Sequence, residues 1–218
     1  MKCTKWTLVL AAALSSVAVV AHAADPVAPA TQAQASVAAD AFIKDITNDV
    51  FATVRGDKAI QAGDLRKVIA VIDAKILPHV NFQRMTASAV GKNWRQATPE
   101  QQKRLQEEFK NLLIYTYAGA AAQIKDQTVE YRPLRARPED TEVVVRSIVR
   151  GQGEPIQIDY RLERSGNTWK VYDVNVLGAW LVQTYQSSFA QEVSASGIDG
   201  LINKLVERNK QLAAKKAG

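Results

Sequence analysis

The periodicity of hydrophobic residues changes twice along this chain, and these changes constrain the fold more than any other sequence feature. Before about residue 127 the apolar residues recur at helical spacing, and from Val129 to Val176 they alternate with polar residues. After Gly178 the helical spacing returns. Alternation is typical of strands with one buried face, so the expected order is helices, four antiparallel strands and helices. This order predicts an α+β fold with helices gathered on one face of a curved sheet.

The helical segments have clear boundary signals. A first helix is expected over 36–55, and a second from Asp64, a suitable N-cap, to a stop at Pro78. The helical spacing continues over 82–91. Thr98-Pro99-Glu100-Gln101 combines an N-cap, a proline at the first helical position and a capping box, which predicts a further helix.

The segment after the sheet divides at a glycine. One helix is expected from Leu181 to about Ser194, with Gly197 as its C-cap, and a last helix begins at Ile198. Residues 211–218 form a basic, Ala-rich tail that we expect to fray. The single α+β domain is therefore expected to span 36–210.

The last hairpin of the expected sheet admits two registers. With Ser165-Gly166-Asn167 as a three-residue turn, Tyr160 pairs with Tyr172 and one face is apolar throughout; this register is favoured here. It also pairs Ile158 with Val174 and Ile156 with Val176. A two-residue turn would set Asp173 beside Tyr160 and bring an acid into the interior. A slip of one residue exchanges the two faces, so the register decides which side chains face the helices.

The N-terminus has the pattern of a secretory signal peptide. Lys2 and Lys5 precede an apolar run, and Ala21-His22-Ala23 provides a cleavage site after Ala23. The run is shorter than a membrane-spanning helix requires, although an uncleaved anchor is the alternative. Residues 24–35 are rich in Ala and Pro and are expected to form a flexible leader. The sequence thus predicts an exported protein with the segments 1–23, 24–35, 36–210 and 211–218.

Export would remove several reactive groups from the chain. The only cysteine, Cys3, leaves with residues 1–23, and His79 remains as the one histidine. Zinc fingers, thiol catalysis and disulfide frameworks are then excluded, and no cofactor or metal is expected. Loss of Lys2 and Lys5 reduces the formal net charge from +6 to +4, too little clustered charge for a nucleic-acid binder. No phosphate-binding glycine loop or nucleophile-elbow motif occurs.

Several separate segments resemble the MlaC (toluene-tolerance) family. The segments that carry the resemblance are Leu77-Pro78-His79-Val80-Asn81-Phe82-Gln83-Arg84-Met85, Gly91-Lys92-Asn93-Trp94-Arg95, Phe109-Lys110-Asn111-Leu112-Leu113 through Tyr117-Ala118, Asp173-Val174-Asn175-Val176-Leu177-Gly178-Ala179-Trp180-Leu181, and Gly197-Ile198-Asp199-Gly200-Leu201. Together they cover roughly 36–210 in the same order. The chain departs from many relatives with Asn in place of Asp at 81, Trp in place of Ser at 180 and Gln in place of Arg at 186. The bulky Trp180 is expected to alter a pocket wall.

The resemblance implies a function as well as a fold. It implies a nuclear-transport-factor-like cone and a periplasmic phospholipid carrier that maintains outer-membrane lipid asymmetry. Such a carrier would be a monomer that hands lipid between an outer-membrane lipoprotein–porin complex and an inner-membrane ABC transporter complex, and it would not be an enzyme.

A phospholipid carrier must enclose the acyl tails. Exposing two tails with roughly two dozen methylenes to water costs on the order of 20 kcal/mol, at about 0.8 kcal/mol for each methylene. A curved sheet closed by apolar helix faces could form that enclosure. The expected lipid-binding residues are Ile72, Ile76, Phe82, Met85, Phe109, Leu113, Tyr117, Val143, Val145, Ile156, Ile158, Tyr160, Tyr172, Val174, Leu181 and Tyr185.

Two other functions remain open from the sequence. Cone folds of this type also host isomerases, in which an acid in an apolar pocket acts as general base, and Asp173 would be the candidate. A periplasmic lipoprotein chaperone would use the same cavity for a protein-linked acyl chain. The same apolar residues would also suit an ordinary filled core.

Overall fold

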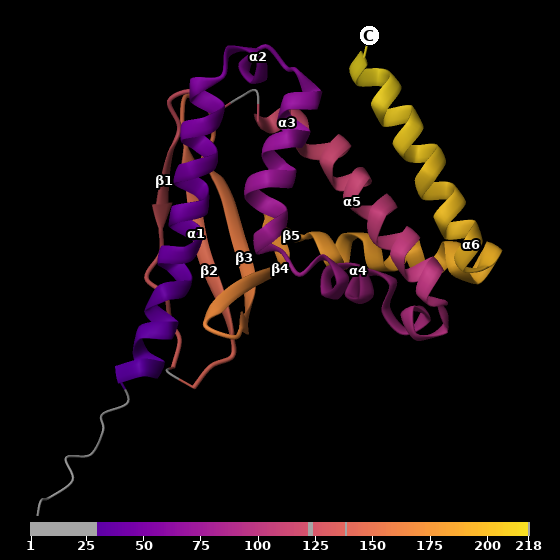
Figure 1. Cartoon of the computed structure of the whole chain (residues 1–218), viewed down its shortest axis with the longest axis horizontal. Helices are drawn as coiled ribbons and strands as arrows, with labels where there is room; N and C mark the ends of the chain where they lie inside the picture. Colours follow the sequence, from indigo (N-terminus) through magenta and orange to yellow (C-terminus); the bar gives the residue numbers. More distant parts are fainter. Residues whose placement is uncertain (1–29, 122–123, 138, 218) are drawn as a thin grey trace, which may run out of the picture.

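The computed structural model describes residues 30–121, 124–137 and 139–217, arranged as a sheet with helices on one side and a helical lobe beside it (Figure 1). The expected signal peptide, 1–23, and the first part of the leader lie outside the described residues. The helices are α1 (Ala30–Gly56), α2 (Lys58–Gln61), α3 (Leu65–Val71), the π-helix η1 (Ile72–Ile76), the 3-10 helix η2 (Leu77–His79), α4 (Phe82–Val90), the 3-10 helix η3 (Gly91–Gln96), α5 (Pro99–Ala121) and α6 (Leu181–Ala217). The strands are β1 (Thr128–Tyr131), β2 (Glu142–Arg150), β3 (Ile156–Ser165), β4 (Thr168–Val176) and β5 (Ala179–Trp180).

The sheet contains five strands in the order β1-β2-β3-β4-β5, and every neighbouring pair is antiparallel. The α+β class is confirmed, but the expectation that the sheet ends at Gly178 is wrong. Leu177 and Gly178 both have positive φ, 54° and 89°, and they form a tight turn that lets Ala179 pair with Val176. The chain therefore adds a short fifth strand before α6.

The register of the β3–β4 hairpin combines parts of both alternatives. The turn has two residues, because Ser165 pairs with Thr168, so the expected three-residue turn is wrong. A β-bulge after Val171 leaves Tyr172 unpaired and restores the apolar face, so that Tyr160 pairs with Val174 rather than with Tyr172.

The bulge shifts the other expected pairs as well. Ile158 pairs with Val176 rather than with Val174, and Asp173 pairs with Arg161 on the opposite face of the sheet. One extra residue therefore keeps the valines of β4 inward although the sequence alternation is interrupted.

The helix boundaries follow local capping. Thr98 and Gln101 form the expected capping box, with the Gln101 amide donating to Thr98 Oγ1 at 3.2 Å and the Thr98 amide donating to Gln101 Oε1 at 3.0 Å. Gly197, with φ 71°, divides α6 where the sequence predicted two helices. α1 begins at Ala30, before the expected helix start at residue 36, and α6 continues to Ala217.

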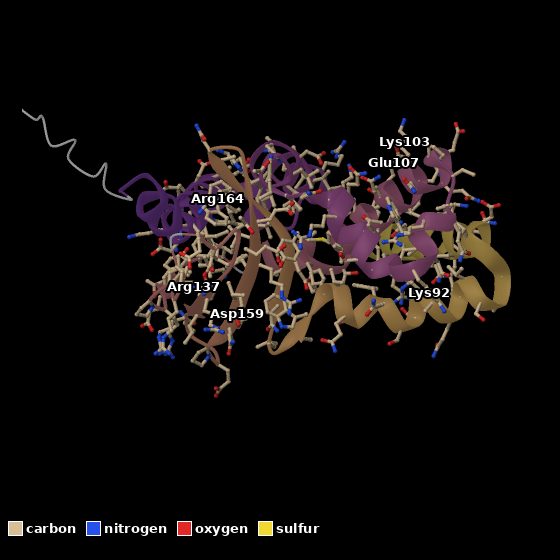
Figure 2. The ribbon with its side chains drawn as sticks, turned by 90° about the horizontal axis from the view of Figure 1, so that it is seen from below. Lys92, Lys103, Glu107, Arg137, Asp159 and Arg164 are labelled. Carbon is tan, nitrogen blue, oxygen red and sulfur yellow. The ribbon has the colours of Figure 1, made fainter. Side chains whose placement is uncertain are left out.

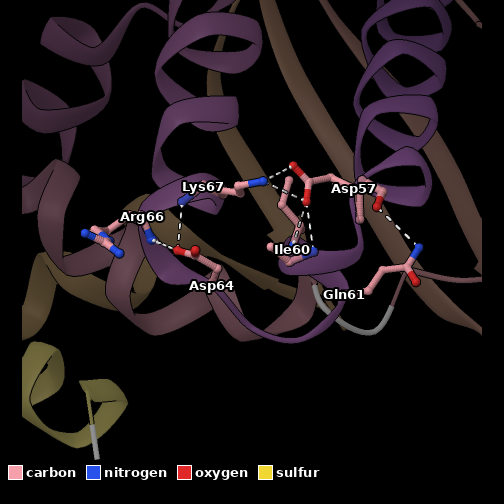
Figure 3. A network of polar contacts seen from close by, with 8 residues as sticks. Asp57, Ile60, Gln61, Asp64, Arg66 and Lys67 are labelled. Atoms are coloured by element: carbon pink, nitrogen blue, oxygen red, sulfur yellow. Dashed lines mark hydrogen bonds and ion pairs between the residues drawn. The ribbon is translucent and has the colours of Figure 1, made fainter.

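The short helices α2 and α3 are connected to each other and to the end of α1 by polar contacts (Figure 3). The Asp57 carboxylate accepts a hydrogen bond from the Ala59 amide at 2.8 Å and pairs with Lys67 Nζ at 2.8 Å. Asp64 caps α3 by accepting from the amides of Arg66 and Lys67. These contacts hold α3 at an angle to α1, with Val68 turned inward.

Three apolar clusters hold the elements together. The first joins α4, α5 and α6 around Phe109; the second packs Ala39 and Ile43 of α1 on β2, β3 and β4; and the third joins α1, α2, α3 and α5 around Ile60. The clusters meet around a space between the sheet and the helices, and that space is the candidate site.

Candidate binding cavity

A cavity of about 510 Å³ lies between the inner face of the sheet and the helices α1, α3, η1, α4 and α5. The wall is formed by Thr47, Val50, Phe51, Val54, Val68, Val71, Ile72, Ile76, Leu77, Val80, Phe82, Met85, Lys110, Leu113, Ile114, Tyr117, Ala118, Ala120, Ile124, Gln127, Val129, Val149, Ile156, Ile158, Tyr160, Val174 and Leu181. The polar side chains of this wall belong to Thr47, Lys110 and Gln127 and to the phenols of Tyr117 and Tyr160. No acidic residue belongs to it.

Each helical wall presents a stripe of residues spaced three or four apart. Thr47, Val50, Phe51 and Val54 share one face of α1, because residues at that spacing lie side by side on a helix. Leu113, Ile114, Tyr117 and Ala118 form the corresponding stripe of α5. Val54 of the first stripe and Ile114 and Ala118 of the second also belong to the third apolar cluster, so the cavity borders that cluster.

The wall between α3 and α4 is less regular. After α3 the chain widens into the π-helix η1 and then tightens into η2 at Pro78. Short π-helical segments occur frequently at functional sites. This irregular stretch places Ile72, Ile76 and Leu77 on the cavity although they do not follow a single helical period.

The sheet supplies the opposite wall through residues that share its inner face. The pairs Val149 with Ile156 and Tyr160 with Val174 each lie directly opposite across a strand boundary. Paired residues of antiparallel strands point to the same face, so these side chains form one apolar surface. Leu181, the first residue of α6, adds to the same surface where the chain leaves the sheet.

Most of the residues expected from the sequence lie on this wall. Those that line the cavity are Ile72, Ile76, Phe82, Met85, Leu113, Tyr117, Ile156, Ile158, Tyr160, Val174 and Leu181. The other five expected residues, Phe109, Val143, Val145, Tyr172 and Tyr185, do not line it.

The five residues outside the wall have other packing partners. Phe109 and Tyr185 lie in the helical lobe with ring centroids 5.1 Å apart. Val143 and Val145 are on the inner face of the sheet, but they are covered by α1 in the second apolar cluster. Tyr172, displaced by the bulge, faces outward and donates to Glu142 Oε2 at 2.8 Å.

The largest groups of wall residues that sequence reasoning did not assign to the cavity come from α1 and α5, and a smaller group comes from the α5–β1 connection. The α1 stripe was recognised as an apolar helix face, yet nothing in its pattern distinguishes a wall of a cavity from a filled core. Ile124 and Gln127 lie in a segment without helical or strand periodicity, so no sequence pattern marks them as wall residues.

The cavity opens to solvent beside α5 and the start of β3. Tyr117 and Ile156 both belong to the wall and are each 40% exposed. Lys110 also lines the cavity, and Arg55 donates through Nη2 to the carbonyl oxygen of Gln127, another wall residue. Two cationic side chains therefore lie at or beside an otherwise apolar opening.

A group of hydroxyls lies where the cavity meets the second apolar cluster. Burial raises the pKa of the Tyr160 phenol to about 12, mainly because the ionised form would lose its hydration. Burial likewise raises the pKa of Tyr131, while its contact with Thr47 opposes the shift. Thr47 Oγ1 and Ser147 Oγ already donate to the carbonyls of Ile43 and Ile158, at 2.8 and 2.7 Å. These side chains therefore stay neutral and give the cavity a weakly polar margin without charge.

The geometry suits an apolar ligand with a polar end. The volume is within the range of roughly 300–1,000 Å³ found for small-molecule sites, and the wall can replace water around hydrocarbon along most of its length. Within 30–121, 124–137 and 139–217, no group of His, Cys, Asp and Glu side chains could hold a metal ion. Among the helices of the same residues, none is both long and apolar enough to span a bilayer.

Comparison with known proteins agrees with this geometry. A model of the family described as MlaC protein matches residues 44–207. The chain belongs to this family. The family match includes every element that lines the cavity, from the end of α1 to the start of α6.

Three similar proteins can be compared in detail. A phospholipid-binding protein from Ralstonia solanacearum, solved in complex with a phospholipid, is 51% identical, covers 80% of this chain and 98% of its own, and superposes with a TM-score of 0.78. The toluene tolerance protein ttg2D of Pseudomonas putida is 31% identical over 105 residues, which are 48% of this chain and 49% of that protein. The chain thus matches about half of that relative's length. The intermembrane phospholipid transport system binding protein MlaC of Haemophilus influenzae is 22% identical over 78% of this chain and 81% of its own.

Within the MlaC family, the Trp180 of this chain was expected to alter a pocket wall, but it lies outside the cavity. The Trp180 ring stacks on the guanidinium of Arg161, 3.8 Å from its centroid, on the outer face of the sheet. Trp180 therefore leaves the cavity volume unaffected.

Asp173 lies beside this stack and is 1% exposed. Its carboxylate pairs with Arg161 Nη1 at 3.0 Å and accepts from the backbone amides of Val174 and Val182, at 2.9 and 3.1 Å. Burial raises the pKa of Asp173, while these hydrogen bonds and Arg161 oppose the shift. Because it caps the start of α6 and lies away from the cavity wall, Asp173 is not positioned as a base toward a bound ligand.

Charged side chains occupy both halves of the molecular surface. Figure 2 shows Arg137 and Arg164 on the sheet side and Lys92, Lys103 and Glu107 on the helical side. Arg137 pairs with Asp140 at 3.0 Å and Arg150 with Glu130 at 2.7 Å, so the charges of both arginines are partly neutralised by neighbouring carboxylates.

Proposed function

We propose that this protein is a phospholipid carrier that encloses acyl tails in the cavity and leaves the headgroup at the opening. The observation that carries the proposal is the apolar wall of a cavity of about 510 Å³, which includes Lys110 and Gln127, and Arg55 donates to the Gln127 carbonyl. Apolar side chains would stabilise the tails, and the two cations suit a phosphate at the surface. The 51% identical Ralstonia protein, solved with a phospholipid, supports the same assignment.

The family supports a role in transport between membranes. The Haemophilus relative is named as a binding protein of an intermembrane phospholipid transport system. By analogy, this chain would work in the periplasm after cleavage at Ala23, as a monomer and not as an enzyme. It would exchange phospholipid with an outer-membrane lipoprotein–porin complex and an inner-membrane ABC transporter complex, and so maintain lipid asymmetry.

Transport places a limit on the affinity of the carrier. The chain has no nucleotide-binding motif, so net direction would be set by its partners. Lipid distributes between donor, carrier and acceptor according to their relative affinities for it. The affinity of the cavity for phospholipid must therefore be close to that of the donor and the acceptor, because a much tighter carrier would not release its lipid. An aliphatic wall without a buried charge pair suits such moderate, unselective binding.

Native mass spectrometry tests the proposal directly. The protein is purified without detergent from the periplasm, weighed in its native state and then extracted with organic solvent. We expect an added mass that is extracted as diacyl phospholipid. Protein without bound lipid would contradict the proposal, and a copurifying acylated protein would identify a lipoprotein chaperone instead.

A further inference from the structure

Three large hydrophobic residues are exposed in the part of the chain that the structure describes, and all three lie at or beside the cavity opening. Tyr117 and Ile156 line the cavity and are each 40% exposed. Leu177 is 69% exposed, and its amide donates to the carbonyl of Gln157 at 3.1 Å, next to Ile156. Scattered apolar side chains on a surface need no explanation, but a group continuous with an apolar cavity does. We call Tyr117, Ile156 and Leu177 the rim.

Leu177 is unfavourable at its position for two reasons. It occupies the first place of a two-residue turn with φ 54°, followed by Gly178 with φ 89°. Such turns favour Asn, Asp or Gly at both places, because a branched side chain is strained at positive φ. It also exposes a large aliphatic side chain to water. A residue that carries both costs suggests a functional role.

The turn between β3 and β4 has residues that suit its backbone conformation, unlike the turn at Leu177. Gly166 and Asn167 join β3 to β4, and Gly166 takes the positive φ of 60° at no steric cost. That turn lies at the opposite end of the hairpin from the rim. The contrast indicates that Leu177 is not required by the geometry of the turn.

We propose that the rim contacts the hydrocarbon region of a lipid bilayer, so that an acyl tail passes between membrane and cavity along an apolar path. The inference rests on the proposed function, because it specifies how the cavity is filled. Each methylene exposed to water costs about 0.8 kcal/mol, so a continuous apolar path lowers the barrier to transfer. Arg55 and Lys110 at the opening would face the phosphates of the bilayer surface, although Lys110 Nζ is also 3.9 Å from the Asp73 carboxylate.

The size of the rim favours a bilayer over a protein partner. A stable protein–protein interface buries about 800 Å² on each partner and needs shape complementarity. The rim offers three side chains, and its neighbours from Arg150 to Pro155 and Gln157 are exposed polar or small residues. A fluid hydrocarbon surface requires no matching shape, and a brief contact is sufficient for transfer.

The experiment measures phospholipid uptake from vesicles of phosphatidylethanolamine and phosphatidylglycerol by delipidated protein. In Leu177→Asn the exposed apolar side chain is lost, while Asn tolerates the positive φ, so the variant is expected to fold at least as stably as the unmodified protein. We expect uptake about fivefold slower, with the same lipid content at equilibrium, because Leu177 lies outside the cavity wall. Gly166→Asn is the matched control, since its Cβ meets no atom within 4 Å and it lies away from the rim; its uptake rate should not change.

A second variant, Ile156→Thr, removes apolar surface from another side of the opening and should also slow uptake. Unchanged uptake in both rim variants would overturn the proposal and leave the rim as a contact for a protein partner. If the unmodified protein neither copurifies with phospholipid nor takes it up from vesicles, the proposed function fails as well. Slow uptake with normal equilibrium lipid content supports the bilayer contact specifically.

Discussion

The helical lobe and the cavity are built from similar apolar residues, yet one is filled and the other is open. In the lobe, aromatic rings from α4, α5 and α6 interlock, with Phe109 5.9 Å from Phe82, 5.1 Å from Tyr185 and 5.3 Å from Phe189. Around the cavity the wall is mainly Val, Ile and Leu, with fewer aromatic rings, and it encloses a space of about 510 Å³. The comparison teaches that hydrophobicity alone does not distinguish a filled core from a cavity wall, because both regions are apolar.

The largest effect is expected from a glutamate placed either in the filled core beneath α1 or on the cavity wall. Val145 is 1% exposed beneath α1, so Val145→Glu would bury an unpaired charge at a cost of several kcal/mol and prevent folding. Ile158→Glu lies on the cavity wall, where the carboxylate can reach the cavity space. We expect a folded protein without bound phospholipid, measured by circular dichroism and solvent extraction.

Ile158→Leu is the control for Ile158→Glu, because it keeps the apolar volume of the side chain, and the variant should still bind phospholipid. If Ile158→Glu still carried phospholipid, the inner face assigned to β3 would be wrong.

Two leucines of α5 give a matched comparison of filled and open regions. Leu105 is fully buried in the lobe, whereas Leu113 lines the cavity. Leu105→Ala should reduce the free energy of unfolding by about 2–5 kcal/mol, because it creates a new void. Leu113→Ala should cost about 1 kcal/mol, because part of its surface already faces the cavity. Urea unfolding of delipidated protein measures both, and equal costs would contradict the distinction.

Asp173→Asn tests whether the outer face of the sheet contributes to stability alone or also to phospholipid binding. The amide keeps an oxygen for the Val182 amide but loses the ion pair with Arg161, so we expect a loss of about 1–2 kcal/mol of stability. Bound phospholipid, determined by extraction, should be unchanged. Loss of bound phospholipid at unchanged stability would indicate that Asp173 takes part in lipid binding.

The smallest effect concerns alkaline pH. The pKa of Tyr160 is raised to about 12 in the fold, whereas the unfolded chain ionises near its ordinary value of 10.0. Between these values the unfolded state has lost a proton that the folded state keeps, so stability falls as pH rises. We expect Tyr160 to contribute a loss of about 1 kcal/mol at pH 11, and Tyr160→Phe should remove that share. Tyr172, whose pKa is also raised to about 12, contributes separately in both proteins. Urea unfolding at pH 9 and pH 11 checks this, and an identical slope in the variant would contradict it.

The sequence predicted the elements better than their contacts. Three expectations that depend only on nearby residues are confirmed. They are the capping box of Thr98 and Gln101, the division of the last helical segment at Gly197, and the antiparallel strands β2 and β3. The β-bulge at Tyr172 could not be predicted, because it depends on how β4 meets both β3 and Val80 in space.

The cavity itself was predictable as a list of apolar faces but not as a volume. Phe109 and Leu113 share one stripe of α5, and only the approach of α4 and α6 separates the buried ring from the wall residue. Residues of the α5–β1 connection were missed because a wall without periodicity has no sequence signature.

The capping of α6 by Asp173 has a consequence for how the cavity can change its size. Leu181 on the wall is adjacent to Val182, whose amide is fixed by a buried carboxylate, so this side of the cavity is rigid. The opposite side, α3 and η1, packs through Val68 in the third apolar cluster, and its polar ties are the exposed pairs Lys67–Asp57 and Lys75–Asp49. Exposed ion pairs contribute at most about 1 kcal/mol each. We therefore expect a bulkier cargo to displace α3 and η1 rather than the start of α6.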